Sequence, residues 1–445
     1  MTEHAHRMVV PIGAVAAAAW VLLNWDAPVL EDSLFWWVPK GIKAGEVGFP
    51  LVPAGDLPAA MNPLSFQLPQ WAGGLPDYGH PPLWYWWLGV WTHLGVDLNA
   101  IRMATLLPAM AAGAGFAALG RRLGSAWAGL AVFGLPPFLA QLLRPELDLP
   151  LLAIIPWALI ALMDRSWGRF AALSGLATLC KEPGVLLAAP AVIVALQERR
   201  WRWAALTPLA VLFGWGLVHG WMAKPERLPD GLVGWLTDLG TVAFIAFIAQ
   251  GRFILLTGIL RFRNAPTLAA FVGTWLVFFS FVGFFANRGT ADAYTHVRYL
   301  LPGIAVAAVV LAQRRPWLAA LGLWWLNSAS PYGPEASMFG VHQGRAERQA
   351  AEWIDQQVRD GRVVWVGTHQ AAGLLEPWAG IADKAVTGFR IYDVNTTASE
   401  VLPGHIVMDV AYGEPSGAVL TGRAKASLDE WRVHDGRVTA WRLEN

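Results

Sequence analysis

The chain has 445 residues, of which 55% are hydrophobic and only 15% are charged, and it carries 26 tryptophans. This composition is typical of a polytopic membrane protein and excludes an ordinary water-soluble domain. The net charge of +1, without a basic block, gives no reason to expect a nucleic-acid partner. The single cysteine, Cys180, excludes an intramolecular disulfide framework and a cysteine-based metal cluster.

Apolar stretches in chain order predict about eleven transmembrane helices. The expected spans are 8–24, 99–120, 125–142, 149–163, 168–180, 183–197, 203–222, 240–260, 267–286, 299–313 and 316–329. The first could alternatively belong to a cleaved signal sequence, although no small-residue cleavage site follows it before Asp26. Alternate turns carry the arginines and the acids, so the positive-inside rule places the N-terminus in the cytoplasm and the C-terminal part outside.

The segment 25–98 is predicted to be a large outer loop, because it is too long and too rich in aromatic residues for a simple connection. Within it, 32–44 and 81–94 are expected to form short helices on the membrane surface, where half-wet, half-apolar tryptophan side chains are stable. A membrane-crossing helix at 82–94 is the alternative, but about 13 residues are few for a bilayer core.

The composition changes after Ser328, which predicts two parts: a transmembrane domain over 1–330 and a small soluble α/β domain over 331–445 outside the cytoplasm. In the second part, 345–359 has the pattern of an amphipathic helix and 363–367 that of a buried strand. The stretches 401–410 and 438–443 are further strand candidates. One glycine at a strand end, Gly367, is too little to indicate a nucleotide site.

Ionisable groups beside a bilayer cost free energy unless they are solvated or paired, so four clusters on the predicted outer face are candidate site residues. Glu31 and Asp32 could act as a general base or bind a divalent metal ion, or could only offset a helix dipole. The other three clusters contain cations that could bind a phosphate. Alternatively, they are solvated ion pairs, a surface turn with a salt bridge, and an arginine that snorkels. Their residues are Arg144, Glu146 and Asp148; Lys181 and Glu182; and Arg298 and Tyr299.

His80 precedes two prolines that favour an extended entry into the following helix, which directs its ring toward the loop. It could bind a metal ion together with Glu31 and Asp32, or donate a hydrogen bond to a phosphate; packing or capping is the alternative. The sequence has no H-E-x-x-H motif and no Walker loop, which argues against a zinc protease and a nucleotide-driven pump.

Four stretches resemble motifs of the GT-C polytopic glycosyltransferases, in particular the bacterial relatives of protein O-mannosyltransferases and of the aminoarabinose lipid A transferase. The most specific resembles the family's (His/Lys)-Pro-Pro-Leu-aromatic motif: Gly79-His80-Pro81-Pro82-Leu83-Trp84-Tyr85-Trp86. The other three resemble the acidic pair of the first outer loop, a Lys-Glu-Pro stretch and a late Arg-Tyr-Leu-Pro element. They are Glu31-Asp32-Ser33-Leu34-Phe35-Trp36, the stretch 175–184, and Arg298-Tyr299-Leu300-Leu301-Pro302.

The resemblance covers roughly residues 8–313. It implies an enzyme of the cytoplasmic membrane that transfers a sugar, with inversion, from a polyprenyl-phosphate carrier to a lipid, glycan or protein acceptor on the outer face. It implies a carboxylate base in the outer loop, and the order Glu-Asp in place of the usual Asp-Glu leaves open whether this is Glu31 or Asp32. Lys181, Arg298 and Arg144 would take up the charge of the departing phosphate.

Two interpretations from other classes stay open at this point. A transporter or flippase for a lipid-linked or anionic substrate would also carry charges within the membrane, but the two similar halves expected of many transporters are not visible in the sequence. A non-catalytic scaffold would use the outer domain to bind a partner. No cofactor is required by the sequence; a divalent metal ion is the one candidate.

Overall fold

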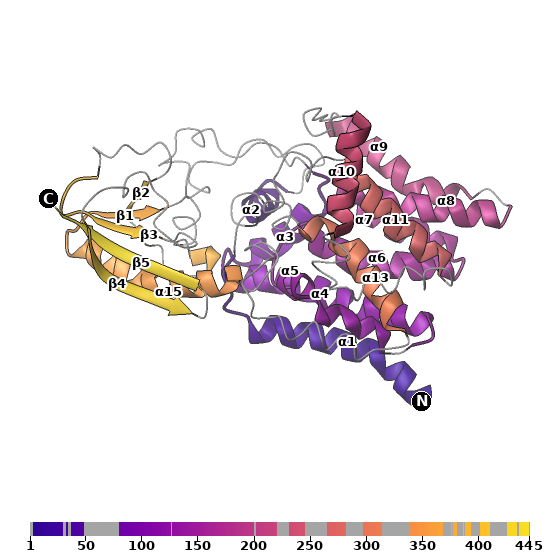
Figure 1. Cartoon of the computed structure of the whole chain (residues 1–445), viewed down its shortest axis with the longest axis horizontal. Coiled ribbons are helices and arrows are strands. Elements are labelled where there is room, and N and C mark those ends of the chain that lie inside the picture. Colours follow the sequence, from indigo (N-terminus) through magenta and orange to yellow (C-terminus); the bar gives the residue numbers. More distant parts are fainter. Residues whose placement is uncertain are drawn as a thin grey trace.

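The computed structural model describes residues 3–29, 33, 37–48, 80–125, 127–199, 202–219, 231–244, 265–281, 297–313, 339–367, 375, 377–380, 386, 388–392, 401–409, 425–433 and 436–444. Helices form one body, and a small sheet with one long helix forms a second body beside it (Figure 1). The described elements from Glu3 to Ala312 build the helical body. The predicted boundary near residue 330 lies outside the described residues.

The helical body contains twelve described helices and four 3-10 turns. The helices are α1 Glu3–Leu23, α2 Val38–Val47, α3 Leu83–Leu94, α4 Leu98–Arg122, α5 Pro136–Gln141, α6 Asp148–Met163, α7 Trp167–Cys180, α8 Ala188–Gln197, α9 Thr207–His219, α10 Gly231–Phe244, α11 Pro266–Phe281 and α13 Leu301–Ala312. The 3-10 turns are η4 Ala128–Gly134, η5 Glu182–Leu187, η6 Trp203–Leu206 and η10 Val297–Leu300.

Most of these elements coincide with the apolar stretches of the sequence, but several differ. The span expected at 183–197, for example, is the 3-10 turn η5 followed by the helix α8. The single span expected at 125–142 is wrong: it is the 3-10 turn η4 followed by the short helix α5, with extended backbone at Leu135. Two prolines follow Leu135, and a residue before proline disfavours the helical conformation. Helix α10 begins at Gly231, well before the expected 240. The expected span 316–329 lies outside the described residues.

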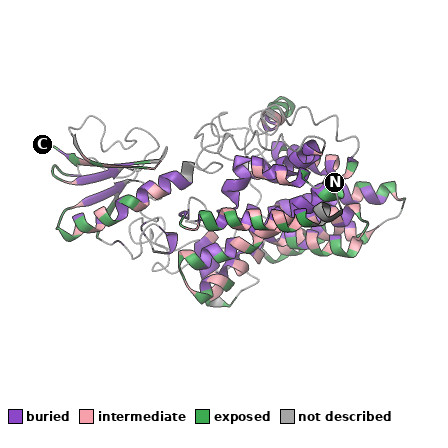
Figure 2. Cartoon of the chain, turned by 90° about the horizontal axis from the view of Figure 1, so that it is seen from below, coloured by how far each residue is buried: buried purple, intermediate pink, exposed green. Residues whose placement is uncertain are grey.

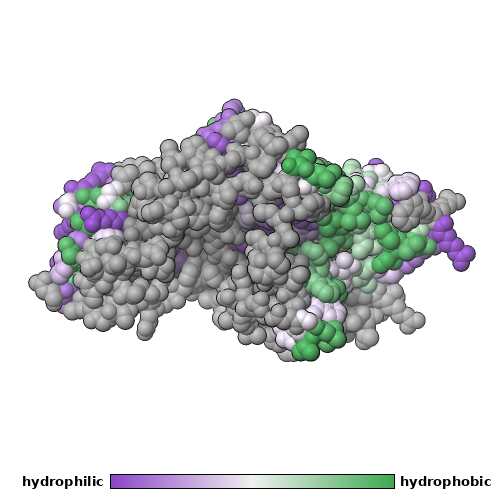
Figure 3. Space-filling view, turned by 90° about the horizontal axis from the view of Figure 1, so that it is seen from above, coloured by the Kyte–Doolittle hydropathy of each residue, from purple (hydrophilic) through white to green (hydrophobic). Residues whose placement is uncertain are grey.

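One described helix, α4, is long and apolar enough to cross a membrane on its own; the shorter apolar helices have 10–17 residues. The number of eleven spans therefore stays a prediction. Exposed apolar side chains nevertheless gather on the helical body, while hydrophilic and apolar residues are mixed at the end that holds the sheet (Figure 3). On α9 and α10 they include Leu209, Phe213, Leu217, Leu232 and Val233. A large exposed apolar surface of this kind is typical of a face that contacts lipid or another protein.

Helices α1 and α4 pack against each other through glycine. A Cβ atom built on Gly13 would lie 2.4 Å from the carbonyl oxygen of Gly113, and one built on Gly113 would lie 2.2 Å from that of Gly13. Small residues at such a crossing let two backbones approach closely, as in membrane helix pairs. The interior between the helices is apolar and buried along most of its length (Figure 2).

The second body has a five-stranded sheet with α15 (Phe339–Arg359) on one face. Its strands are β1 Val364–Gly367, β2 Arg390–Tyr392, β3 Ile406–Asp409, β4 Lys425–Val433 and β5 Gly436–Leu443. The order is β2-β1-β3-β5-β4, with β1 parallel to β2 and β3 and the remaining pairs antiparallel. Ala350 and Ile354 of α15 pack on Val364 and Val366, while Trp365 points to the opposite face. This alternation follows from the two-residue period of a strand.

The predicted helix at 345–359 and the strands at 363–367 and 438–443 are confirmed, with shifts of a few residues at their ends. The candidate strand 401–410 is shorter than expected and covers Ile406–Asp409. Two strands were missed. Strand β2 has three residues, and β4 combines polar residues with a bulge between Ser427 and Asp429, so neither shows a regular alternation.

A buried acid on α15 predicts a pH-dependent stability. Glu347 faces the sheet and accepts a hydrogen bond from Gln343 Nε2 at 3.3 Å, and burial raises the pKa of its carboxyl to about 8. The folded state therefore binds this proton more tightly than the unfolded chain, so the free energy of unfolding falls as the pH rises from about 4.5 toward 8. We expect E347Q to raise the free energy of unfolding at pH 8 by about 1–3 kcal/mol, which raises the melting temperature as well. At pH 5 we expect both quantities to change little.

Thermal unfolding of the full chain at the two pH values measures this difference. The control is E352Q, which changes an exposed acid on the same helix and is expected to have no pH-dependent effect. An E347Q effect of equal size at pH 5 and pH 8 would contradict the assignment of the raised pKa to Glu347.

Candidate functional site

The predicted site residues that the structure describes all lie at helix ends or in the turns beside them. His80 precedes α3, Arg144 and Glu146 lie between α5 and α6, and Asp148 is the first residue of α6. Lys181 and Glu182 join α7 to η5, and Arg298 and Tyr299 lie in η10 before α13. Glu31 and Asp32 lie outside the described residues.

Proline explains why the chain turns at these places. Pro183 stands in the first turn of η5 and Pro302 in the first turn of α13, where the missing N–H group costs no helical hydrogen bond. Lys181, which precedes Glu182 and Pro183, has an extended backbone with φ −159° and ψ 142°. The helix therefore stops at Cys180, and the side chain of Lys181 leaves the helical path.

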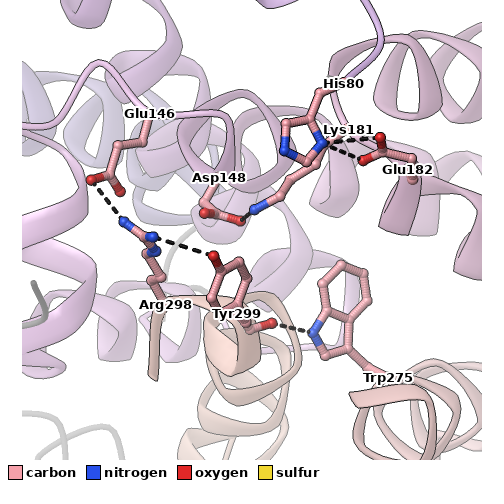
Figure 4. A network of polar contacts seen from close by, with 8 residues as sticks. All are labelled: His80, Glu146, Asp148, Lys181, Glu182, Trp275, Arg298 and Tyr299. Atoms are coloured by element: carbon pink, nitrogen blue, oxygen red, sulfur yellow. Dashed lines mark hydrogen bonds and ion pairs between the residues drawn. The ribbon is translucent and has the colours of Figure 1, made fainter. Parts of the chain in front are cut away.

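Glu146 lies between two arginines in the interior of the helical body. Its Oε1 accepts a hydrogen bond from Arg298 Nη1 at 3.1 Å (Figure 4). It also accepts one from Arg144 Nη1 at 3.4 Å. All three side chains are buried. Within the described ranges, the other carboxylate oxygen of Glu146, Oε2, is buried without a hydrogen-bond partner. Buried polar atoms are normally paired, so this oxygen is a candidate contact for a ligand.

Lys181 forms a second buried ion pair in the same region. Its Nζ donates a hydrogen bond to Asp148 Oδ1 at 2.7 Å, and both side chains are buried. The alternative of a surface turn with a solvated salt bridge is therefore wrong for Lys181. Desolvation of two charges is costly, so such a pair is weak evidence for stability and is more often retained for another reason.

The ring of Tyr299 lies between the two ion pairs. Lys181 Nζ is 4.5 Å from the ring centroid, and the guanidinium carbon of Arg298 is 5.0 Å from it, both within cation–π range. The Tyr299 hydroxyl accepts a hydrogen bond from Arg298 Nη2 at 3.2 Å. Its backbone carbonyl accepts one from Trp275 Nε1 at 2.7 Å (Figure 4). Tyr299 thus holds both cations at one place.

His80 and Glu182 form a separate, more accessible pair. His80 Nδ1 lies 2.8 Å from Glu182 Oε2 and 3.0 Å from Oε1, and the two side chains are 31% and 34% exposed. The ring of Trp37 packs edge-on against His80 with 5.3 Å between the centroids. A carboxylate on one ring nitrogen fixes the orientation of an imidazole and presents the other nitrogen elsewhere. His80 therefore has a defined polar contact as well as a packing contact, and its role in binding a substrate stays a prediction.

Several cations gather in this buried region. Among the described residues, Arg144, Lys181 and Arg298 lie beside two buried carboxylates, Glu146 and Asp148. Buried cations favour binding of an anion, and arginine binds phosphate with two parallel hydrogen bonds. We call these five residues and Tyr299 the cation cluster. Chemically, it can bind a phosphate group.

The candidate metal site receives no support from the part of the chain that the structure describes. There, no three histidine, cysteine or carboxylate side chains lie together as a metal ion requires. Two of the three candidate ligands, Glu31 and Asp32, lie outside these residues, so a metal at Glu31, Asp32 and His80 stays a prediction.

Sequence reasoning missed several residues that support the cluster. Trp275 stands inside an apolar span and contributes an indole N–H to the Tyr299 carbonyl, while Trp84 Nε1 donates to the Pro145 carbonyl at 3.1 Å. Arg102 is fully buried within α4. A charged residue inside an apolar stretch was the available signal for Arg102, since burial of an arginine requires partners.

The structure is similar to the crystal structure of ArnT from Cupriavidus metallidurans bound to undecaprenyl phosphate. The TM-score is 0.50, the sequence identity is 14%, and the similarity covers 96% of this chain and 97% of that chain. No family model matches the sequence, and no curated protein matches it. The similarity shows that the chain has the fold of that structure over nearly its whole length.

Proposed function

We propose that the chain is a membrane glycosyltransferase that moves a sugar from a polyprenyl-phosphate carrier to an acceptor on the outer face of the cytoplasmic membrane, with inversion. The single observation that carries this proposal is the cation cluster, in which three buried cations share two carboxylates on the fold of ArnT. A lipid-linked donor brings one phosphate into a bilayer, and the grouped buried cations are residue types that bind phosphate.

In the proposed reaction, an acceptor hydroxyl attacks the anomeric carbon while a carboxylate takes its proton. The bond between that carbon and the phosphate oxygen breaks, and its electron pair leaves with the polyprenyl phosphate. Charge develops on the phosphate in the transition state, where preorganised cations in a water-poor site stabilise it most. Arg298 and Lys181 have this role, and Arg144 supports it from the far side of Glu146.

Glu31 or Asp32 is the proposed base, since an outer-loop carboxylate is the residue type that the acceptor proton needs. His80 is proposed to donate a hydrogen bond from its second ring nitrogen to a substrate oxygen, while Glu182 holds the ring through Nδ1. The buried Oε2 of Glu146 is a suitable acceptor for a sugar hydroxyl. The C-terminal domain is proposed to lie on the same outer side.

The experiment is transfer from a panel of labelled polyprenyl-phosphate sugars by the full chain in lipid nanodiscs. We expect turnover of one donor by the native chain and none by the double variant E31Q/D32N. The matched control D429N/E430Q changes another adjacent acidic pair, on strand β4, and should retain turnover.

Normal transfer by E31Q/D32N would exclude the acidic pair as the base. No turnover of any donor by the folded native chain would instead favour a transporter or a scaffold.

A further inference from the structure

A short segment of the chain lies between the two bodies and is held from both sides. We call residues 24–29 the docking turn; it follows α1 and leads into the outer loop. From the C-terminal domain, Arg345 on α15 pairs with Asp26 at 3.0 Å and donates a hydrogen bond to Asn24 Oδ1 at 3.2 Å. The backbone N–H of Val29 donates to the carbonyl of Ala379 at 3.0 Å.

Close backbone packing accompanies these hydrogen bonds. A Cβ atom built on Gly344 of α15 would lie 2.0 Å from Pro28 Cγ, so only glycine lets this part of the helix reach the docking turn. Gly380 has a φ of +84° and would place a Cβ atom 2.4 Å from Leu98 Cδ2 at the start of α4. Val29 and Ile101 belong to the same buried apolar cluster as Ala346 and Ile354 of α15. The domain contact is therefore a packed interface.

From the helical body, Arg102 binds the inner side of the docking turn. Its Nε donates to the carbonyl of Trp25 at 3.3 Å, and its Nη2 donates to the carbonyl of Ala27 and, at 3.4 Å, to that of Pro28. The side chain is fully buried. A buried guanidinium must fill its donors to avoid a large desolvation cost, and here backbone carbonyls fill them.

The third nitrogen of the same guanidinium, Nη1, binds the backbone beside the cation cluster. Arg102 Nη1 donates to the carbonyl of Leu143, the residue directly before Arg144. The turn that follows is short and fixed: Arg144 N donates to Gln141 O at 3.1 Å, and Trp84 Nε1 donates to Pro145 O at 3.1 Å. One planar group thus joins the docking turn to the backbone that carries Arg144 and Glu146.

We propose that Arg102 is a positioning residue that transmits docking of the C-terminal domain to the cation cluster. The C-terminal domain binds the docking turn through Arg345, and Arg102 connects that turn to the carbonyl of Leu143. The position of Leu143 in turn determines where Arg144 contacts Glu146. The coupling itself rests on the described contacts alone, and its consequence for phosphate binding rests on the proposed function. The C-terminal domain thereby contributes to the site through the docking turn.

Geometry explains why arginine is needed at this position. The donors of a guanidinium point in several fixed directions, so one side chain can bind carbonyls from two chain segments at once. A lysine has three donors on one nitrogen atom and cannot span the same two segments. R102K therefore keeps the charge and removes the link.

The first test is hydrogen exchange of the ligand-free full chain in nanodiscs, comparing native protein with R345A. Loss of the Arg345 contacts should speed exchange at the docking turn and, through Arg102, speed exchange of the amides of 142–144 by about fivefold. R345K keeps the charge that pairs with Asp26 and should restore the native rate. The control R359A breaks the pair with Asp355 (2.8 Å) on the same helix and should change neither segment.

In the R102K background, R345A should speed exchange only at the docking turn, because the link to Leu143 is already gone. Faster exchange at 24–29 with native rates at 142–144 in R345A alone would overturn the proposal. So would an equal R345A effect on 142–144 in both backgrounds.

The second test is the dissociation constant for undecaprenyl phosphate. We expect R345A and R102K each to raise it about tenfold, and the double variant to raise it no further than R102K alone, because both act through one connection. Additive effects, or native affinity in R102K, would overturn the proposal. If the native chain does not bind undecaprenyl phosphate, the proposed function fails, while hydrogen exchange still decides whether Arg102 couples the two sites.

Discussion

Replacement of Arg298 by methionine (R298M) should lower the transfer rate by about 10²–10³-fold, the loss that follows removal of one preorganised charge donor. Arg298 is buried and donates to Glu146 at 3.1 Å and to the Tyr299 hydroxyl at 3.2 Å, so its guanidinium is held in a fixed position. We expect kcat/KM for the polyprenyl-phosphate sugar to fall accordingly, measured by transfer of labelled sugar in nanodiscs.

Two variants make this result specific. R298K keeps the charge but loses the planar fork, and we expect it to recover only part of the activity. The control R122M removes an exposed arginine that pairs with Asp164 at the C-terminal end of α4. We expect its transfer rate to be unchanged. Native transfer by folded R298M would remove Arg298 from the phosphate site.

Replacement of Lys181 by methionine (K181M) should lower both activity and stability. The free energy of unfolding should fall by about 3–5 kcal/mol, the cost of leaving Asp148 buried without its partner. Transfer should fall by about 10²-fold, because the charge 4.5 Å from the Tyr299 ring no longer stabilises the departing phosphate. Thermal unfolding and transfer rates measure the two effects.

The double variant K181M/D148N separates the effect on stability from the effect on transfer. Removing both members of the pair should restore most of the stability, since no unpaired charge remains, while transfer stays low. If transfer returns together with stability, Lys181 is a structural residue and takes no part in phosphate binding.

Most of the helices could be predicted because their signal is local. An apolar stretch with a proline or an arginine at its end marks a helix such as α6 or α11, and the amphipathic pattern marks α15. The break at Leu135 is set by the two prolines that follow it within an apolar stretch, and periodicity alone does not reveal such a break.

The sequence identified the residues of the candidate site but not their partners. Glu146 and Arg298 are 152 positions apart, and Asp148 and Lys181 are 33 apart, so no local rule pairs them. The same charged residues can form either a solvated or a buried ion-pair cluster, and the sequence does not show which of the two the tertiary structure creates. Arg102 was overlooked because its partners are backbone carbonyls, which no sequence pattern displays.

For Glu31 and Asp32, the sequence predicts a role that the described part of the structure does not test. The resemblance of the motifs implies that they supply the base, and they lie outside the described residues, so their role stays a prediction. The nearest described residues on either side are Val29 and Ser33, and Trp37, further along the same loop, packs on His80.

The central claim is that the cation cluster binds the phosphate of a polyprenyl carrier. Equilibrium binding of labelled undecaprenyl phosphate to the full chain in nanodiscs tests it most directly, with R298M and K181M/D148N beside the control R122M. We expect saturable binding by the native chain and by R122M, and at least tenfold weaker binding by the other two, a loss of about 1.4 kcal/mol or more. No binding by the native chain, or equal binding by all four proteins, would contradict the claim.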